Sequence, residues 1–405
     1  MAFGRYDYAA FASFFAYAAG SVVVPVVLVT LARELHFNLE SGGMTAGGAL
    51  HLGRTALMMV SMLLCGFAGG RWGKRRTVGW SVALMAAGVG LCAVSPVYGV
   101  LFLAMMLAGL GEGVIEGLAT PFVQCLHPTE SGRYINFTHS FWSVGVLVTT
   151  LVSGWLLTGG VSWRVLVAAA SAVGFFAALL LLWPERKDAR YPEHPKPLDT
   201  RAIWDQMRAV LSTRRFWLFY AAMFVAGGGE FALTFWCASY IQLNVVDAAW
   251  AGGVGTACFA GGMVLGRTGW GYLIDQHHLR RLIILSAAAG AVITAALPFV
   301  THLGWLFVLL FLSGVAVAPY WPSVQSYCTD RLPQLDSTML LILLSCAGIP
   351  GCGVTTWLVG LIGNHYGLKT ALYLVPISLI ILAALIVYDW KRPSVTQSTP
   401  RTQTG

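Results

Sequence analysis

The sequence has 405 residues, of which 57% are hydrophobic and only 10% are charged, and it carries a formal net charge of +8. An average soluble domain is about one quarter charged, so this composition excludes an ordinary soluble enzyme or binding module and favours a membrane protein. The positive charge requires no nucleic acid, because basic loops beside a bilayer face anionic lipid head groups.

Twelve apolar stretches have the length that a helix needs to cross a bilayer. They cover residues 9–32, 43–70, 78–94, 98–126, 134–158, 163–183, 215–243, 249–274, 281–299, 304–327, 337–363 and 369–390. The strands of a membrane barrel would be shorter and would alternate apolar and polar residues. The first stretch exceeds the core of a typical signal peptide, so we expect it to be retained. The predicted fold class is an all-α integral membrane protein with twelve transmembrane helices.

Lysine and arginine lie mostly on one side of these predicted helices. If the N-terminus is cytoplasmic, the inner loops and tails hold 20 of the 25 basic residues and the outer loops hold three. Positive charge favours the cytoplasmic side, so both termini are predicted to be cytoplasmic in a plasma (inner) membrane.

The predicted helices divide into two sets of six. Residues 1–183 form the N-terminal half and 215–390 the C-terminal half, joined by a cytoplasmic linker at 184–214. Within the linker, residues 200–212 place apolar side chains on one helical face, which predicts a helix lying on the membrane surface. Residues 391–405 are rich in Ser, Thr, Pro and Gln and are expected to form a disordered cytoplasmic tail.

The second stretch contains two basic side chains, His51 and Arg54, on one helical face. Arg54 lies near the middle of its stretch, where its guanidinium cannot easily reach water. It therefore needs a buried acid, a backbone carbonyl or a substrate, and we expect Glu112 or Glu116 to be its partner. Both a purely structural ion pair and a contact with substrate fit this pattern.

The fourth stretch contains two carboxyl groups, Glu112 and Glu116, which lie one helical turn apart on one face. A carboxylate facing lipid is costly, so this face is expected to point into the protein or into a water-filled cavity. A carboxyl group that gains and loses a proton at membrane depth is what proton-coupled transport requires. The alternative is a structural role in an ion pair or in helix packing.

A third carboxyl group, Glu230, follows three glycines in the seventh stretch, where glycine permits bending and close approach. Trp236 and Tyr240 follow it, and Trp321 lies in the tenth stretch. Aromatic rings that stack on a sugar, beside carboxyl groups that bind its hydroxyls, indicate a carbohydrate site that includes His51. The alternative is that these aromatic residues belong to interfacial belts.

An internal repeat relates the two halves. The segment Gly66-Phe-Ala-Gly-Gly-Arg-Trp-Gly-Lys-Arg-Arg76 matches Gly271-Tyr-Leu-Ile-Asp-Gln-His-His-Leu-Arg-Arg281 in its first glycine and its closing arginine pair, 205 residues later. This pattern resembles the basic signature of the major facilitator superfamily, which implies two pseudo-symmetric six-helix halves. The resemblance, with Arg267 placed eight residues before Asp275, implies a cytoplasmic conformational latch made of Arg71, Lys74, Arg75, Arg76, Arg267, Asp275, Arg280 and Arg281.

Shorter motifs resemble the fucose permease subfamily. Glu116-Gly-Leu-Ala-Thr120-Pro-Phe-Val is similar to the Glu-x-x-x-Asn-Pro-Phe-Val of its helix 4, and Asn136-Phe-Thr-His139 resembles the start of its helix 5. The resemblance implies that Glu116 binds the coupled proton and that Thr120, Asn136 and His139 bind substrate. The subfamily also has an acid in helix 1, and Ser21 stands at the matching position here.

The sequence therefore predicts a secondary transporter that couples protons to the symport of a small polar solute, such as a monosaccharide, by alternating access. Export or exchange of an organic anion or drug is the main alternative, since Arg54 could hold an anion. A transporter-like membrane sensor is a less favoured alternative, because a sensor would be expected to carry an added signalling domain. No nucleophile, phosphate loop or metal spacing indicates an enzyme, a cofactor or a metal, and the eight cysteines fit no metal motif. The expected partners are substrate, protons and lipid, with no nucleic acid, and the chain is expected to be a monomer.

Overall fold

The computed structural model describes residues 3–128, 131–184, 190–192, 200–273 and 276–391. Within these ranges twelve helical segments are long and apolar enough to span a membrane. They confirm the predicted all-α fold with twelve transmembrane helices, and the described ranges contain no strand. Helices suit such apolar sequences because lipid offers no hydrogen-bond partner, so every backbone group has to be satisfied within the segment.

The N-terminal half consists of six long helices. They are α1 (Arg5–Glu34), α2 (Met44–Trp72), α3 (Lys74–Ala93), α4 (Tyr98–Leu126), α5 (Ser131–Thr158) and α6 (Trp163–Leu182), with a short 3-10 turn, η1 (Leu39–Ser41), before α2. α1 is buried along nearly its whole length because it packs against α5 and α6 and also touches α8 of the other half. The linker contributes α7 (Thr200–Ser212).

The C-terminal half repeats this plan with more interruptions. Its elements are α8 (Arg214–Asn244), α9 (Ala249–Leu273), η2 (Gln276–His278), α10 (Leu279–Ala296), η3 (Leu297–Phe299), α11 (Leu303–Val317), α12 (Tyr320–Arg331), α13 (Ser337–Tyr366), α14 (Leu368–Ala371) and α15 (Leu374–Trp390). The predicted stretch 304–327 is one span built from two helices, since Pro319 lies at the break between α11 and α12 and proline cannot continue the backbone hydrogen bonding.

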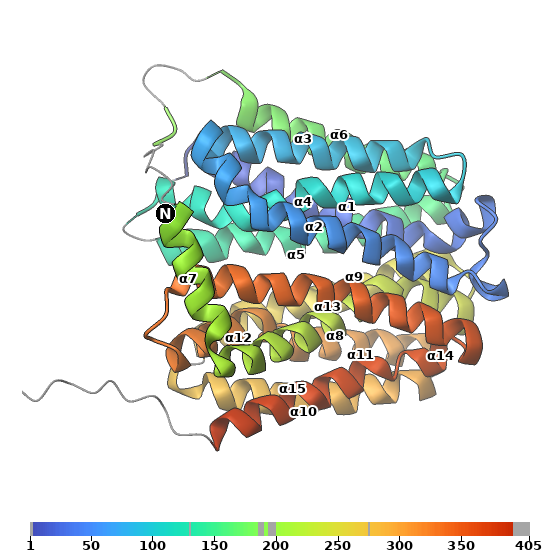
Figure 1. Ribbon diagram of the computed structural model, residues 1–405. Helices are drawn as coiled ribbons and strands as arrows, with labels where there is room; N and C mark the ends of the chain where they lie inside the picture. The colour runs from blue at the N-terminus through green and yellow to red at the C-terminus, as the bar shows by residue number, and fades with distance from the viewer. Residues whose placement is uncertain (1–2, 129–130, 185–189, 193–199, 274–275, 392–405) are drawn as a thin grey trace, which may run out of the picture.

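The two halves lie side by side and are connected through α7. Figure 1 shows α1–α6 above α8–α15, with α7 crossing between them at one end of the bundle. That end also holds Arg5, where α1 begins, and Trp390, where α15 ends, and we call it the terminal face. The opposite end is the distal face. Between the halves, α2 packs against α13 and α5 packs against α9.

The halves meet very closely toward the distal face. Gly154 of α5 lies against Gly253 of α9, and Gly48 of α2 lies against Trp357 of α13. A Cβ atom on Gly154 or Gly48 would overlap the facing backbone, so any larger residue at either position would hold the helices apart. We call this region the distal seam. Its residues are Gly48, Gly154, Gly253, Trp357, Gly360 and Asn364.

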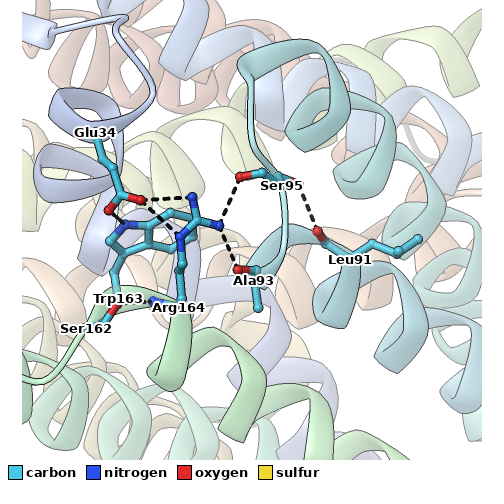
Figure 2. A network of polar contacts seen from close by, with 7 residues as sticks. All are labelled: Glu34, Leu91, Ala93, Ser95, Ser162, Trp163 and Arg164. Carbon is cyan, nitrogen blue, oxygen red and sulfur yellow. Dashed lines mark hydrogen bonds and ion pairs between the residues drawn. The ribbon is translucent and has the colours of Figure 1, made fainter.

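At the distal face of the N-terminal half, Arg164 joins three helices (Figure 2). Its guanidinium pairs with Glu34 at the end of α1 at 2.8 Å, and Nη1 donates to the carbonyl oxygens of Ala93 and Ser95 at 2.8 and 2.9 Å. Those two carbonyls lie at the end of α3, where a helix leaves acceptors without intrahelical partners. The Trp163 indole N–H donates to Glu34 at 2.5 Å. The network holds α1, α3 and α6 together as one unit.

The C-terminal half has a corresponding cluster at the terminal face, centred on the fully buried Asp389. Its carboxylate pairs with Arg215 at 2.7 Å and Arg331 at 3.0 Å, and it accepts a hydrogen bond from the Tyr327 hydroxyl at 2.9 Å. These partners lie at the beginning of α8 and in α12, so the cluster ties α8, α12 and α15 together. A buried carboxylate is tolerated only with such pairing. Polar clusters of this kind make each half resist internal rearrangement.

Candidate functional site

Arg54 and Glu112 form a buried ion pair between α2 and α4, and each side chain is only 1% exposed. Arg54 Nε donates to Glu112 Oε2 at 2.6 Å, and Nη2 contacts Oε1. The other contacts reach α1, where Nη1 donates to the Ser21 carbonyl at 3.1 Å and Nη2 donates to its hydroxyl at 2.9 Å. The expected pairing of Arg54 with an acid of α4 is confirmed, and the partner is Glu112.

The glycines around Glu112 explain how α4 comes so close to α2. A Cβ atom at Gly109 would overlap the carbonyl oxygen of Arg54, and a Cβ atom at Gly113 would overlap that of Met58. The two backbones are therefore in contact. Close approach of this kind, which small residues permit between membrane helices, places the Glu112 carboxylate directly on the guanidinium.

Glu116 lies one turn beyond Glu112, nearer to the terminal face, and is partly buried. Unlike Glu112, it forms no ion pair with any residue that the structure describes. The Tyr17 side chain of α1 interacts with the Glu116 carboxyl group, and the Arg267 guanidinium of the other half is close enough to exert an electrostatic attraction on it. Glu116 is therefore the acid of α4 that faces both halves without a dedicated counter-ion.

A second ion pair joins Arg267 of α9 to Glu230 of α8. Arg267 Nη2 lies 2.9 Å from Glu230 Oε1, and the two side chains are 28% and 9% exposed. The guanidinium also lies over the Trp142 ring of α5 in the other half, with 5.5 Å between its central carbon and the ring centroid. Arg267 was expected to take part in a latch, whose acidic residue, Asp275, lies outside the described residues, and the structure pairs Arg267 with Glu230. This pair bridges the halves through Trp142.

Two residues implied by the fucose permease resemblance lie together. The Thr120 hydroxyl is 3.0 Å from His139 Nε2, which joins α4 to α5. The His139 ring lies against Phe14 of α1, with 4.5 Å between ring centroids. Both residues are partly buried on the α1–α4–α5 side of the central region. The side chain of Asn136, the third residue of that group, lies outside the described part of the chain.

His51 has an apolar environment. Its ring stacks on Phe231 of α8 with 4.2 Å between centroids and an interplanar angle of 2°, and Phe235 lies next to it. The ring is buried, and neither ring nitrogen has a hydrogen-bond partner among the described residues. His51 therefore lies at the interface of the two halves, against aromatic rings of α8.

The three aromatic residues predicted to bind substrate are not brought together. Trp236 is fully buried and its indole N–H donates to the Thr356 carbonyl at 2.9 Å, which places it in the distal seam. Tyr240 donates to the Leu297 carbonyl at 3.3 Å. Trp321 is partly buried and packs against two hydrophobic clusters of the core.

Two of the basic residues expected to form a latch, Arg75 and Arg280, contact their own halves in this conformation. Arg75 donates to the Leu181 carbonyl oxygen at the end of α6 at 2.6 Å. Arg280, its counterpart in the repeat, lies over the Trp390 ring at the end of α15, 4.1 Å from the centroid. Lys74 is partly buried, and the exposed members are Arg71, Arg76 and Arg281. Their role as a latch stays a prediction.

The sequence analysis did not single out Tyr17 or Trp142, although a signal for each was present. Tyr17 precedes Ser21 by four residues, so the two share the face of α1 that meets the α4 acids. Trp142 follows His139 by three residues on α5 and shares its face. In the part of the chain that the structure describes, no group of three His, Cys, Asp or Glu residues could hold a metal ion.

Comparison with known proteins gives a family model and one relative that match most of the chain, and relatives that match shorter parts of it. The family model described as Major Facilitator Superfamily matches residues 9–255 and 243–404. The "Putative metabolite transport protein" of Haemophilus influenzae is 24% identical over 341 residues, 79% of this chain and 80% of that protein. The multi-drug resistance efflux pump PmrA of Streptococcus pneumoniae is 28% identical over 117 residues, which span only 29% of its length. "Probable polyol transporter 4" of Arabidopsis thaliana is 28% identical over 162 residues, 38% of this chain and 29% of that protein.

Three solved transporters share the fold at low sequence identity. A D-xylose-proton symporter has a TM-score of 0.76 at 14% identity, over 96% of this chain and 98% of that one. A bacterial homologue of the human lysosomal transporter Spinster, in an inward-facing and occupied conformation, has a TM-score of 0.71 at 16% identity, over 95% and 96%. The E. coli fucose:proton symporter FucP has a TM-score of 0.63 at 15% identity, over 94% and 98%.

Proposed function

The chain belongs to the major facilitator superfamily of membrane transporters, and we propose that it couples the movement of a proton to the passage of a small polar solute, with Glu116 carrying the proton. The halves rock about the central residues, so that the solute site opens to one side of the membrane at a time. The chain works as a monomer in the plasma (inner) membrane.

The charge balance of the central residues carries this proposal. Three carboxyl groups, Glu112, Glu116 and Glu230, face two guanidinium groups, Arg54 and Arg267, so full ionisation leaves one negative charge. Each guanidinium is paired with a different acid, which leaves Glu116 as the unpaired one. A buried charge without a counter-ion opposes closure of the protein around it, whereas a protonated carboxyl group does not. Proton binding at Glu116 therefore selects between conformations.

Orientation follows from the loops. With 20 of 25 basic residues on the side of the termini, the terminal face is cytoplasmic and the distal seam faces outside. The conformation described here, with the halves in backbone contact at the distal seam, is then closed toward the outside. In this conformation the proton on Glu116 and the solute bound beside it are released toward the cytoplasm.

The solute is a small polar molecule such as a monosaccharide. Two structural neighbours are named as D-xylose and fucose symporters with protons, and a local sequence match is named as a polyol transporter. Arg54, the residue that could have held an anionic substrate, already directs its N–H groups to Glu112 and Ser21. That arrangement favours an uncharged solute over an organic anion. The polar groups that we propose to bind it are Glu230, His51, Thr120 and His139.

Transport by Glu116→Gln in proteoliposomes tests the proposal, with labelled xylose and fucose as probes. Glutamine imitates a carboxyl group that never releases its proton. Accumulation driven by a pH gradient is expected to be lost, while exchange between vesicles loaded with the same sugar on both sides continues. Asp205→Asn, the same chemical change on the exposed face of α7, serves as the control. Accumulation by Glu116→Gln at the wild-type rate would show that another group carries the proton.

A further inference from the structure

The Arg267–Glu230 ion pair leaves one buried donor and one buried acceptor unused. Only Nη2 and Oε1 meet, at 2.9 Å. Arg267 Nε and Glu230 Oε2 are both buried, and neither has a hydrogen-bond partner in the described part of the chain. A buried polar atom without a partner is costly, so a molecule that satisfies both atoms gains more than it would from an ordinary surface contact.

Arg54 provides an internal comparison, because it is equally central but each of its guanidinium nitrogens already has a hydrogen-bond acceptor. Its Nε, Nη1 and Nη2 all donate to Glu112 or Ser21. Of the two central ion pairs, the one at Arg54 is therefore closed, and the one at Arg267 retains hydrogen-bonding capacity. Arg267 also lies against the Trp142 ring of the other half, so a molecule bound to the pair would touch both halves.

The chemistry of the two unused atoms restricts what can satisfy them. A guanidinium N–H only donates and an ionised carboxylate oxygen only accepts. An anionic group would accept from Arg267 but would be repelled by Glu230, and an ammonium group would donate to Glu230 but would be repelled by Arg267. A hydroxyl group both donates and accepts hydrogen bonds without carrying charge. Of two neighbouring hydroxyls, one can accept from Arg267 Nε–H while the other donates to Glu230 Oε2.

From this we infer that Arg267 and Glu230 together form the recognition element for an uncharged polyhydroxyl solute, and that the Trp142 ring forms an apolar wall beside it. The inference rests on the proposed function, since it identifies the class of molecule that the transporter carries. It also gives Arg267 a direct role in selecting substrate. Because the two atoms are buried here, the solute reaches them when the halves open, and its binding stabilises the state in which it is enclosed.

Equilibrium binding to the purified transporter, at one pH and without a membrane gradient, tests the inference. The neutral probes are glucose, xylose, fucose and mannitol, and the charged probes are glucuronate and glucosamine, which retain the ring of glucose. Binding is followed by the rise in melting temperature that a ligand of the folded state produces. At least one neutral probe is expected to bind more tightly than both charged ones. Tighter binding of glucuronate or glucosamine, or no binding of any neutral probe up to its solubility limit, would overturn the inference.

Conservative variants then test whether the Arg267–Glu230 pair is what binds the neutral probe. Glu230→Gln replaces a charged acceptor with a neutral amide, and Arg267→Lys keeps the positive charge but lacks the Nε–H donor. Each is expected to weaken binding of the neutral probe by about tenfold or more. Asp205→Asn on exposed α7 controls for a general effect of removing a carboxylate.

Unchanged affinity in both variants, each folded as judged by its own melting temperature, would contradict the inference. The result is separable from the proton experiment. Neutral probes that bind through Glu230 while Glu116→Gln still accumulates them would refute the coupling and leave the recognition element intact.

Discussion

Asn364 of α13 caps the first turn of α2 in the opposite half of the molecule. The Met44 backbone N–H donates to Asn364 Oδ1 at 2.9 Å, and Asn364 Nδ2 donates to the Thr45 hydroxyl at 2.5 Å. The residue that precedes α2 is Gly43, whose lack of a side chain leaves the first N–H groups of the helix uncapped from within. The cap is complete only while the distal seam is closed.

Asn364→Ala is therefore expected to shift the protein toward states that are open at the distal face. Loss of a helix cap costs about 0.5–2 kcal/mol, which raises the open fraction by about two- to thirty-fold. The measurement is the labelling rate of Thr356→Cys, a fully buried position in α13, in a protein whose eight natural cysteines have been replaced. Asn364→Asp retains a capping oxygen and is expected to label slowly. Equal rates for Asn364→Ala and the parent protein would rule out this role for the cap.

The buried pair at Arg54 leads to a second prediction, about stability. Arg54→Ala leaves the Glu112 carboxylate buried without its counter-ion, and breaking one side of such a pair costs about 3–5 kcal/mol. The melting temperature of the purified protein is expected to fall sharply and to recover in part in the double variant with Glu112→Gln. The double variant with Glu116→Gln is expected to show no recovery, because Glu116 is not bonded to Arg54. Recovery with Glu116→Gln instead would contradict the observed pairing.

A third prediction concerns the backbone contact between α2 and α4. Gly109→Ala and Gly113→Ala place a methyl group on the carbonyl oxygens of Arg54 and Met58, and such overpacking costs about 1–3 kcal/mol. Both variants are expected to melt at lower temperature and to lose transport. Gly99→Ala in the same helix is the matched control, since its added carbon meets nothing within 4 Å. Helix propensity alone favours alanine there. A loss of stability equal in all three variants would remove packing as the cause.

The lengths of the continuous hydrophobic stretches determined most of what could be predicted about the fold. The twelve spans follow from continuous hydrophobic runs that no soluble structure accommodates, and a guanidinium in mid-span needs an acid, a backbone carbonyl or a substrate as its partner. The choice between Glu112 and Glu116 was beyond the sequence, because the two lie on one helical face. The rotation of α4 about its own axis, relative to α1 and α2, decides which acid meets Arg54. That rotation depends on glycine contacts between helices that are distant in sequence.

Contacts between residues far apart in the chain account for what was missed. The sequence analysis did not single out Asp389, and only the packing of α8 and α12 against α15 brings Arg215 and Arg331 to it. Arg267 was predicted to belong to a cytoplasmic latch, and nothing in the sequence indicated that α9 directs its side chain toward Glu230 of α8. Periodicity identifies the face of a helix but does not identify the helix that will cover it.

The glycines of the distal seam have a consequence for how this protein tolerates random change. Every substitution of Gly48, Gly154, Gly253 or Gly360 adds atoms where the facing backbone already fills the space, and none can remove any. Mutation at these positions therefore acts in one direction only, against the state that is closed at the distal face. A library of random variants, sorted by which face admits a labelling reagent, would show that asymmetry as an excess of distally open proteins. Natural drift in this seam is limited in the same way, so the closed state can be weakened by accident but strengthened only by changes elsewhere.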